Sequence, residues 1–230
     1  MDQLSRELAE TALDGAYRQL SEVAAGLDAA AVLRPSRCAG WAAGDVLYHQ
    51  LLDARRALRT LASPGTTQPD RDDISYWRSY SSGGDVAPGS QLAAEHARHV
   101  RIVASAYLPA QLSWEWTETA DAACRAARAC PYDLVTTQGH VLQTTDFIGT
   151  LAVEAAVHYL DMVVGLPAAP PPDPIPLRLV RRVLGGLLGA PLAIGWDDET
   201  YALKGTGRLA LTDSERSELG PAADRFPLFG

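Results

Sequence analysis

Residues 147–164 form an apolar segment that is interrupted by three acidic or imidazole side chains, Glu154, His158 and Asp161. On a helix, with about 100° between successive residues, Glu154 and His158 lie one turn apart on the same face. The opposite face carries valine and leucine, so the helix is apolar nearly all round, which is typical of a helix buried on every side. A carboxylate buried there is costly unless it is paired or bound to a metal ion. The segment therefore predicts a central helix in which Glu154 and His158 have a bound partner.

The rest of the first 166 residues shows the apolar spacing of amphipathic helices, with breaks at glycine and proline. Helices are predicted over 3–29, 42–62, 90–107, 110–129 and 146–165. Such long helices favour a four-helix bundle, in which polar sites are built between facing helices. A short hairpin is predicted over 134–142, around Gln-Gly. The Gly-, Pro- and Ser-rich residues 64–90 predict a long loop, and loops of that length are often functional.

A proline-rich stretch, 167–174, is the strongest boundary in the chain. It is predicted to link a helical metal-binding domain over 1–166 to a small C-terminal region over 175–230. In that region the pattern predicts helices over 176–189 and 213–219, and short strands at 192–194, 201–203 and 208–211. The predicted fold class is thus mainly α, a four-helix bundle with a small C-terminal α+β extension.

The composition narrows the classes of function. The 230 residues carry a formal net charge of −8 and contain no run of basic residues, so neither nucleic acid nor an anionic membrane is an expected partner. No apolar stretch reaches the ~20 uninterrupted residues of a membrane-spanning helix. Three cysteines without a CxxC pair and a polar start favour a reducing compartment. We expect a soluble, cytoplasmic monomer or homodimer that acts on a small molecule.

A metal site that acts on a substrate usually has three protein ligands and one open position. Glu154 and His158 supply two ligands, so the third would come from another helix. His49 lies away from the leucine stripe of its helix, and is either a surface side chain or directed into a second groove. Asp53, one turn further on, is expected to orient the His49 ring.

The other histidines fit a site less well. His96 and His99 lie among arginine and glutamine on a polar helix, which favours a solvated face, and His140 follows a glycine in a predicted turn. Spacing alone therefore leaves two interpretations of Glu154 and His158, a metal-binding pair or a buried hydrogen-bonded pair.

Two motifs resemble those of a known family. Residues 35–41 (PSRCAGW) and 44–49 (GDVLYH) resemble the start of the second helix in mycothiol-dependent maleylpyruvate isomerase N-terminal domains, which belong to the DinB-like metalloenzyme superfamily. Residues 154–158 (EAAVH), followed by Asp161, resemble the family's Glu-x-x-x-His motif. The end of the chain is also similar to the tail of actinobacterial members. Gln50 departs from the aliphatic residue that is common after the histidine, and the C-terminal region is shorter than the family's fuller domain.

The resemblance implies a metal triad of His49, Glu154 and His158. Asp53 is expected behind it from its helical spacing, and Asp161 either lies behind it or is a surface carboxylate near the helix end. Two imidazoles and one carboxylate favour Zn²⁺, with Ni²⁺, Fe²⁺ or Mn²⁺ as alternatives. It also implies mycothiol as the thiol cofactor, with no side chain singled out as catalytic, because the open metal position would activate the thiol or a water.

The implied activity is isomerisation of, or S-transfer to, an activated substrate such as a maleylpyruvate-like acid. Two alternatives stay open, a biosynthetic enzyme of the same fold with a thiol-independent reaction and a non-catalytic metal-binding stress-response protein. Cys38 is expected to be a structural loop cysteine. Trp77, Trp114 and Trp116 could form the wall of an aromatic pocket or lie in the core. Arg37 and Arg56 are candidates for holding a substrate carboxylate, and the sequence does not rank them.

Overall fold

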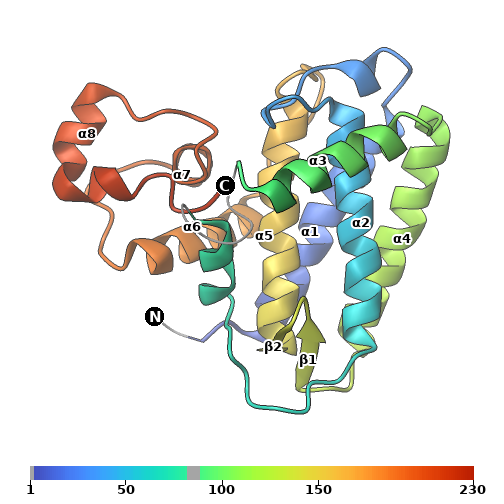
Figure 1. The fold of residues 1–230 in the computed structure, drawn as a ribbon, viewed down its shortest axis with the longest axis horizontal. Helices are drawn as coiled ribbons and strands as arrows, with labels where there is room; N and C mark the ends of the chain where they lie inside the picture. The colour runs from blue at the N-terminus through green and yellow to red at the C-terminus, as the bar shows by residue number, and fades with distance from the viewer. Residues whose placement is uncertain (1–2, 82–88) are drawn as a thin grey trace.

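Four helices lie side by side as a bundle in the computed structural model, which describes residues 3–81 and 89–230 (Figure 1). They are α1 (Arg6–Ala25), α2 (Ala43–Leu61), α4 (Pro109–Ala129) and α5 (Thr144–Val163). α1 and α2 each contact both α4 and α5, so the four helices form a closed ring around one core. The predicted four-helix bundle is confirmed.

α5 is buried on every side, as its apolar composition predicts. From Thr144 to Met162, every residue except Thr145 and Glu154 is buried. Each fully buried Ile, Leu or Phe side chain contributes roughly 1.5–3 kcal/mol, so the packing of α5 dominates the stability of the bundle. It also holds the polar side chains of α5 in fixed positions.

α3 (Gln91–Ala104) lies outside this ring and packs on α2, with Val100 as its single buried residue. Between α2 and α3 the chain forms a 3₁₀ helix, η2 (Ser75–Tyr80), in the region that was predicted to be a loop throughout. The prediction missed this helix because its two buried aromatic residues, Tyr76 and Trp77, are held by tertiary packing rather than by a helical sequence pattern. Residues 82–88 of the predicted loop lie outside the described residues.

The predicted hairpin is present as β1 (Leu134–Thr137) and β2 (His140–Gln143), paired antiparallel. Its turn residues Gln138 and Gly139 both have a positive φ, 48° and 81°. Glycine adopts this left-handed conformation freely, whereas at glutamine it costs energy, which directs attention to the Gln138 side chain.

The C-terminal region is helical where it was predicted to be mixed. It contains α6 (Pro174–Leu188), α7 (Asp198–Gly205), α8 (Asp213–Leu219) and the 3₁₀ helix η3 (Gly220–Arg225). The predicted strands at 192–194, 201–203 and 208–211 are wrong, because no strand is found among the described residues beyond β2. Asp197 accepts a hydrogen bond from the Thr200 amide at 2.7 Å and so begins a helix across the second of them. A short η1 helix (Ala31–Leu33) precedes α2.

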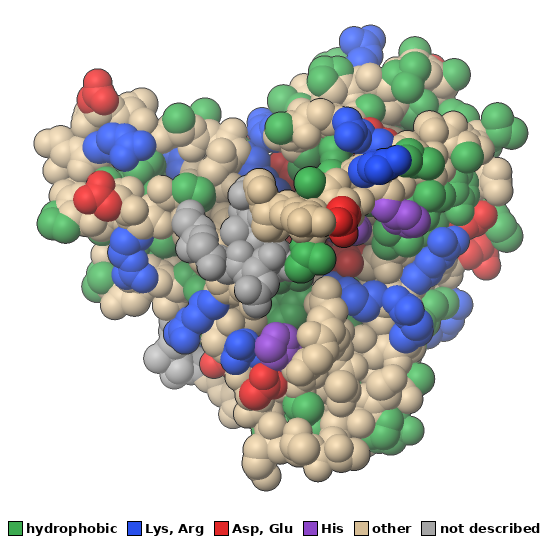
Figure 2. Space-filling model, in the orientation of Figure 1, with side chains coloured by type: hydrophobic (Ala, Val, Ile, Leu, Met, Phe, Trp, Pro, Cys, Tyr) green, Lys and Arg blue, Asp and Glu red, His purple; other side chains and the backbone are tan. Residues whose placement is uncertain are grey.

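The C-terminal region leans against one side of the bundle through α6, which contacts α1 and α5 (Figure 1). The side chain of Gln19 on α1 fastens the proline-rich stretch, donating to the Pro171 carbonyl at 2.7 Å and accepting from the Asp173 amide at 2.8 Å. In the space-filling view a notch separates the two parts at the surface, and acidic and basic side chains both occur across this face (Figure 2). Among the described residues, no helix is long and apolar enough to span a membrane.

Candidate metal centre and its cavity

Three side chains from two facing helices, α2 and α5, converge inside the bundle. His49 on α2 and His158 on α5 both direct Nε2 at the same oxygen, Oε1 of Glu154, at 3.1 and 3.4 Å. One ligand atom from each residue lies within 4.8 Å of the others. The side chains are 11–19% exposed, so the group is nearly buried but reachable. The structure thus brings together the three residues that the sequence singled out as a triad.

His158 lies between two carboxylates, and their negative charges determine how much positive charge the cluster requires. Its Nδ1 is 2.9 Å from Oδ2 of Asp161, while Nε2 faces Glu154. Burial would lower the pKa of His158, but its contacts with Asp161 and Glu154 outweigh burial and raise this pKa well above the usual value. Burial would likewise raise the pKa of Glu154, but His158 and His49 hold it well below its usual range. Glu154 is therefore ionised, and a positive charge is required beside it, either a second proton on His158 or a cation.

The outer nitrogen of His49 has a different partner from the one expected. Nδ1 of His49 lies 3.0 Å from Nε2 of His96 on α3. Asp53 was expected in this place, but its carboxylate pairs with Arg56 instead, with contacts of 3.3 and 3.2 Å. Burial, then the neighbouring His49, lower the pKa of His96, so this imidazole is neutral and can accept the Nδ1 proton of His49. His96 is solvent-exposed as predicted, yet it contacts the cluster because α3 packs on α2.

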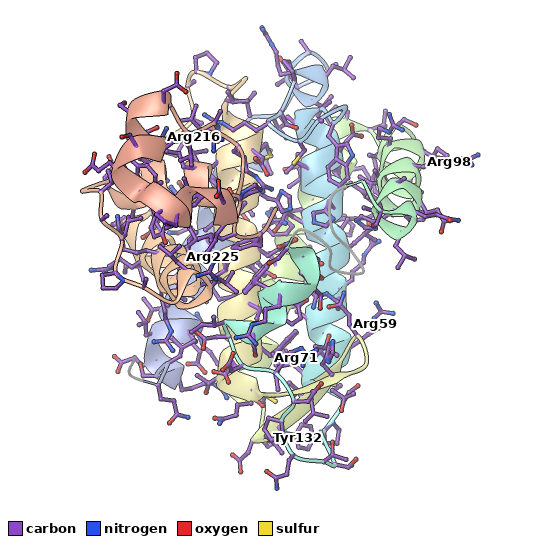
Figure 3. The ribbon with its side chains drawn as sticks, turned by 60° about the vertical axis from the view of Figure 1, so that its left-hand side comes forward. Arg59, Arg71, Arg98, Tyr132, Arg216 and Arg225 are labelled. Atoms are coloured by element: carbon purple, nitrogen blue, oxygen red, sulfur yellow. The ribbon has the colours of Figure 1, made fainter. Side chains whose placement is uncertain are left out.

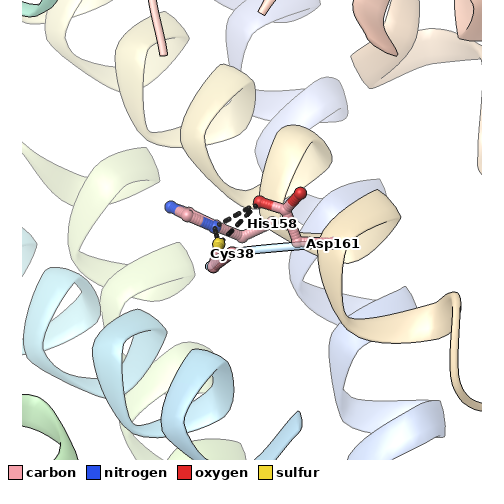
Figure 4. Close-up of side chains that lie close together, drawn as sticks. All are labelled: Cys38, His158 and Asp161. Carbon is pink, nitrogen blue, oxygen red and sulfur yellow. Dashed lines mark hydrogen bonds and ion pairs between the residues drawn. The ribbon is translucent and has the colours of Figure 1, made fainter. Parts of the chain in front are cut away.

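Asp161 is the centre of a second group, on the side of His158 that faces the C-terminal region. Sγ of Cys38 lies 3.1 Å from Oδ2 of Asp161 and 3.8 Å from Nδ1 of His158 (Figure 4). Arg208, which follows α7, holds the same carboxylate with Nε at 3.1 Å from Oδ1 and a terminal nitrogen at 3.0 Å from Oδ2. Burial would raise the pKa of Asp161, but His158 and Arg208 lower it. Cys38 is thus held at the site rather than in an isolated loop.

The loop that carries Cys38 is fastened to the end of α5. The amide of Arg37 donates to the Asp161 carbonyl at 3.0 Å, and the Arg37 guanidinium donates to the Leu160 carbonyl. Gly40 has a φ of 77°, a left-handed conformation that explains the glycine before Trp41. Arg37 is therefore a structural residue of this loop, directed at backbone rather than at the cluster.

A cavity of about 420 Å³ opens beside the cluster, within the range of roughly 300–1,000 Å³ that small-molecule sites occupy. His49, Glu154 and His158 form part of its wall. Much of the remaining wall is aromatic and comes from three different segments; these side chains are Trp41, Tyr76, Trp77, Tyr80 and Phe229.

The predicted wall residue Trp77 is confirmed in that place, whereas Trp114 is exposed and Trp116 is buried in the core. His140 is distant from the cavity wall and pairs with Asp70 at 2.7 Å. Sequence reasoning missed Arg208 and Phe229. The resemblance of the chain end to the family's tail was the one indication in the sequence that these two residues matter. No local pattern marks them, because their role depends on contacts between distant segments.

The donor set suits a divalent ion. Two imidazole nitrogens and one carboxylate oxygen point at a common region, and the opposite nitrogens of both rings have acceptors, Asp161 and His96. A proton on each outer nitrogen leaves each Nε2 lone pair directed at that region, as in metal-binding histidines. A cation there also supplies the positive charge that Glu154 requires. The residues therefore fit a metal ion with one side open to the cavity.

Two histidines and one glutamate that converge from facing helices, open on one side, define a helical-bundle protein with a candidate mononuclear metal centre. The particular family follows from comparison with known proteins. The family described as the mycothiol maleylpyruvate isomerase N-terminal domain matches residues 13–163. The chain belongs to this family.

Solved structures of mycothiol-dependent maleylpyruvate isomerase share the fold. One has a TM-score of 0.54 at 18% sequence identity, and another, of a histidine-to-alanine mutant, has 0.53 at 17%. In both comparisons the match covers 82% of this chain and 72% of the other. A search of curated proteins finds no match. At this identity the solved structures confirm the architecture of the bundle, and the reaction is argued from the site.

Proposed function

We propose that the protein is a metal-dependent enzyme that uses a low-molecular-weight thiol, mycothiol, to isomerise an activated small molecule or to transfer the thiol to it. The observation that carries this proposal is the position of His49, Glu154 and His158 on the wall of a cavity rather than in a closed core. A catalytic metal site combines three protein ligands with an open position in this way. Zn²⁺ suits the donor set best, with Ni²⁺, Fe²⁺ and Mn²⁺ as alternatives.

The chemistry that a divalent ion supplies when bound is deprotonation of a coordinated thiol, since a coordinating thiol loses its proton outright. The side chains of this protein prepare the position. Asp161 accepts the Nδ1 proton of His158 and so keeps the Nε2 lone pair directed at the cluster. Arg208 holds Asp161 ionised, and the aromatic wall lowers the amount of water near the reacting atoms.

The cavity favours an enzyme over a non-catalytic metal-binding protein, because a purely structural site is closed by a fourth protein ligand. A thiol-independent biosynthetic enzyme would use the same three residues to activate water. These two enzymes differ in a simple measurement, the requirement of the reaction for added thiol.

The experiment is metal analysis of the purified protein, followed by metal titration of His49→Ala, Glu154→Ala and a control, His140→Ala. We expect about one divalent ion per chain and a loss of affinity of at least ~100-fold in the first two variants. His140→Ala should bind as the parent does, because His140 pairs with Asp70 away from the cavity. The triad is refuted if His49→Ala and Glu154→Ala bind metal as tightly as the parent.

The reaction is then tested with thiol and electrophile, with and without a chelator. Conjugation or isomerisation that needs both metal and thiol supports the proposed enzyme. Activity that needs metal but not thiol supports the biosynthetic alternative instead.

A further inference from the structure

The charged side chains of the cavity already have partners of their own. Among the residues that the structure describes, Arg56 and Arg208 are the only lysines or arginines on the cavity wall. Arg208 uses Nε and one terminal nitrogen on Asp161, and its other terminal nitrogen donates to the Thr206 carbonyl at 3.0 Å. Three of its five N–H groups are thus used inside the protein, and the Asp161 carboxylate matches its charge, so this guanidinium offers no unpaired positive charge to an anionic substrate.

Arg56 is occupied in the same manner at the other end of the cavity. Nε and a terminal nitrogen face the two oxygens of Asp53 at 3.3 and 3.2 Å. The remaining terminal nitrogen lies 3.5 Å from the Tyr76 hydroxyl and 3.4 Å from Oε1 of Gln138. Asp53 neutralises this guanidinium, so the candidate for binding a substrate carboxylate is already satisfied inside the protein.

Elsewhere in the part of the chain that the structure describes, no further lysine or arginine lines this cavity. Arg59 and Arg98 lie on the outside of the molecule (Figure 3). Residues 82–88, which the structure does not describe, contain neither lysine nor arginine. A dianionic acid bound here would lose its hydration without gaining a free positive partner, which is costly.

Beside the Arg56–Asp53 pair, the polar groups at this end of the cavity are uncharged. The Tyr76 hydroxyl donates to Oε1 of Gln138 at 2.6 Å, and the Tyr80 hydroxyl lies 3.4 Å from that of Tyr76. Gln138 reaches them from the strained hairpin turn, with its φ of 48°. A left-handed glutamine that places its amide at a cavity is the kind of backbone strain that is common at binding sites.

From the internal pairing of both arginines and the aromatic wall, we infer that the electrophile of this enzyme is an uncharged, flat, unsaturated compound and not a dicarboxylic acid. The inference rests on the proposed thiol chemistry and specifies its substrate class. The two charges of a divalent ion would be matched by Glu154 and the thiolate, leaving the cavity with no net charge to offer. Trp41, Trp77 and Phe229 suit a flat apolar body, and Gln138 and Tyr80 suit a carbonyl or amide on its edge.

The addition balances without any further reagent. The sulfur of the thiol forms one bond to an alkene carbon. The thiol gives its proton to solvent, and the neighbouring carbon takes a proton from solvent. The alkene π bond is the bond that is lost, and nothing is oxidised or reduced. Reversal after rotation about the former double bond gives isomerisation instead of S-transfer.

The test compares two ligands of one skeleton that differ in charge, N-phenylsuccinimide and its ring-opened acid, N-phenylsuccinamic acid. Binding is followed by quenching of tryptophan fluorescence, because Trp41 and Trp77 line the cavity. Saturating 2-mercaptoethanol occupies the open metal position, so that the acid cannot bind there. We expect the imide to bind at least about tenfold more tightly than the acid. Equal or tighter binding of the acid overturns the inference.

A substitution at Asp53 should reverse this preference. Asp53→Asn leaves Arg56 without its carboxylate partner, so the Kd of the acid should fall about tenfold while the Kd of the imide changes less than about twofold. Asp70→Asn is the matched control, since Asp70 pairs with His140 outside the cavity, and should leave both Kd values unchanged. An unchanged Kd for the acid in a folded Asp53→Asn variant contradicts the inference.

Failure of this inference is separable from failure of the proposed function. The same ligand comparison is made on chelator-treated protein without thiol, where the pairing of Arg56 and Arg208 still holds and the imide should still be preferred. An enzyme that binds metal and thiol but prefers the acid refutes the substrate class alone. A protein that prefers the imide but binds no metal refutes the proposed mechanism alone.

Discussion

The two sides of the His158 ring carry similar residues but differ in charge balance. On the cavity side, Nε2 faces Glu154, which is also approached by His49. On the other side, Nδ1 faces Asp161, which is fully buried and paired with Arg208. In both groups three potential ligand atoms lie within 4.8 Å of one another, yet only the second group is neutralised by a guanidinium. A metal ion on the Asp161 side would have to displace that guanidinium, so residue type and spacing are not sufficient to identify a metal site.

The largest expected effect is on stability, from Arg208→Met. This change leaves the buried carboxylate of Asp161 without its cation, and breaking a buried pair in this way costs about 3–5 kcal/mol. The free energy of unfolding from urea denaturation measures it. Arg59→Met, at an exposed position, should change it by less than ~0.5 kcal/mol. A similarly small loss in Arg208→Met would mean that the Asp161 side does not depend on its charge balance.

The next effect separates the two sides by metal affinity. Glu154→Gln removes the charge of a proposed ligand and should weaken metal binding by ~100-fold or more, whereas Asp161→Asn acts only through the His158 ring and should weaken it by about tenfold. Competition with a chromogenic chelator measures both constants. If Asp161→Asn costs more affinity than Glu154→Gln, the metal lies on the other side of His158.

A third carboxylate of α5, Asp146, sharpens the comparison. Arg182 lowers its pKa, but this arginine also pairs with Asp73 at 2.7 Å, and the effects that raise the pKa of Asp146 are larger. Burial, then the nearby Asp73 and Asp72, raise the pKa of Asp146 to about 6. Because the folded protein binds the proton more tightly than the unfolded chain, the stability contributed by this group is present below about pH 4 and is lost as the pH rises through about 6. Asp146→Asn should remove that loss.

The expected result for Asp146→Asn is a gain of about 1–3 kcal/mol in the free energy of unfolding at pH 7, and little gain at pH 4. Urea denaturation at the two pH values measures it. The control is Asp28→Asn, since hydrogen bonds from the Ala31 and Ala30 amides lower the pKa of exposed Asp28, and this change should not stabilise. A loss of stability at pH 7 in Asp146→Asn would contradict the argument.

The smallest effect concerns the neutral partner of His49. His96→Ala removes the acceptor for the Nδ1 proton of His49 and should lower metal affinity by about tenfold. This is the low end of the range for residues that orient a metal-binding histidine, because the His96 imidazole carries no charge. His99→Ala, on the exposed face of the same helix, should leave the affinity unchanged. Equal affinities for the two variants would show that His96 does not orient the ring.

Much of the helical architecture was predictable because periodicity is local. The burial of α5 follows from its apolar residues, and the hairpin follows from β-branched residues around Gln-Gly. The tail strands were predicted wrongly because short apolar runs there are compatible with either structure, and Asp197 starts a helix instead. The role of His96 was not predictable, because it depends on how α3 lies against α2. The Asp53–Arg56 pair lies within α2 at i,i+3, so helical spacing allowed it as well as the expected contact with His49.

By itself the sequence determined that Glu154 and His158 share one face of a buried helix, since that follows from the helical repeat and from the apolar residues around them. The tertiary structure decided which charges are matched. Arg208 meets Asp161 across 47 positions of the chain, and Arg182 meets Asp73 across 109. An ion pair forms wherever packing brings opposite charges together in low dielectric, and that meeting is set by the contacts between segments rather than by any spacing along one of them.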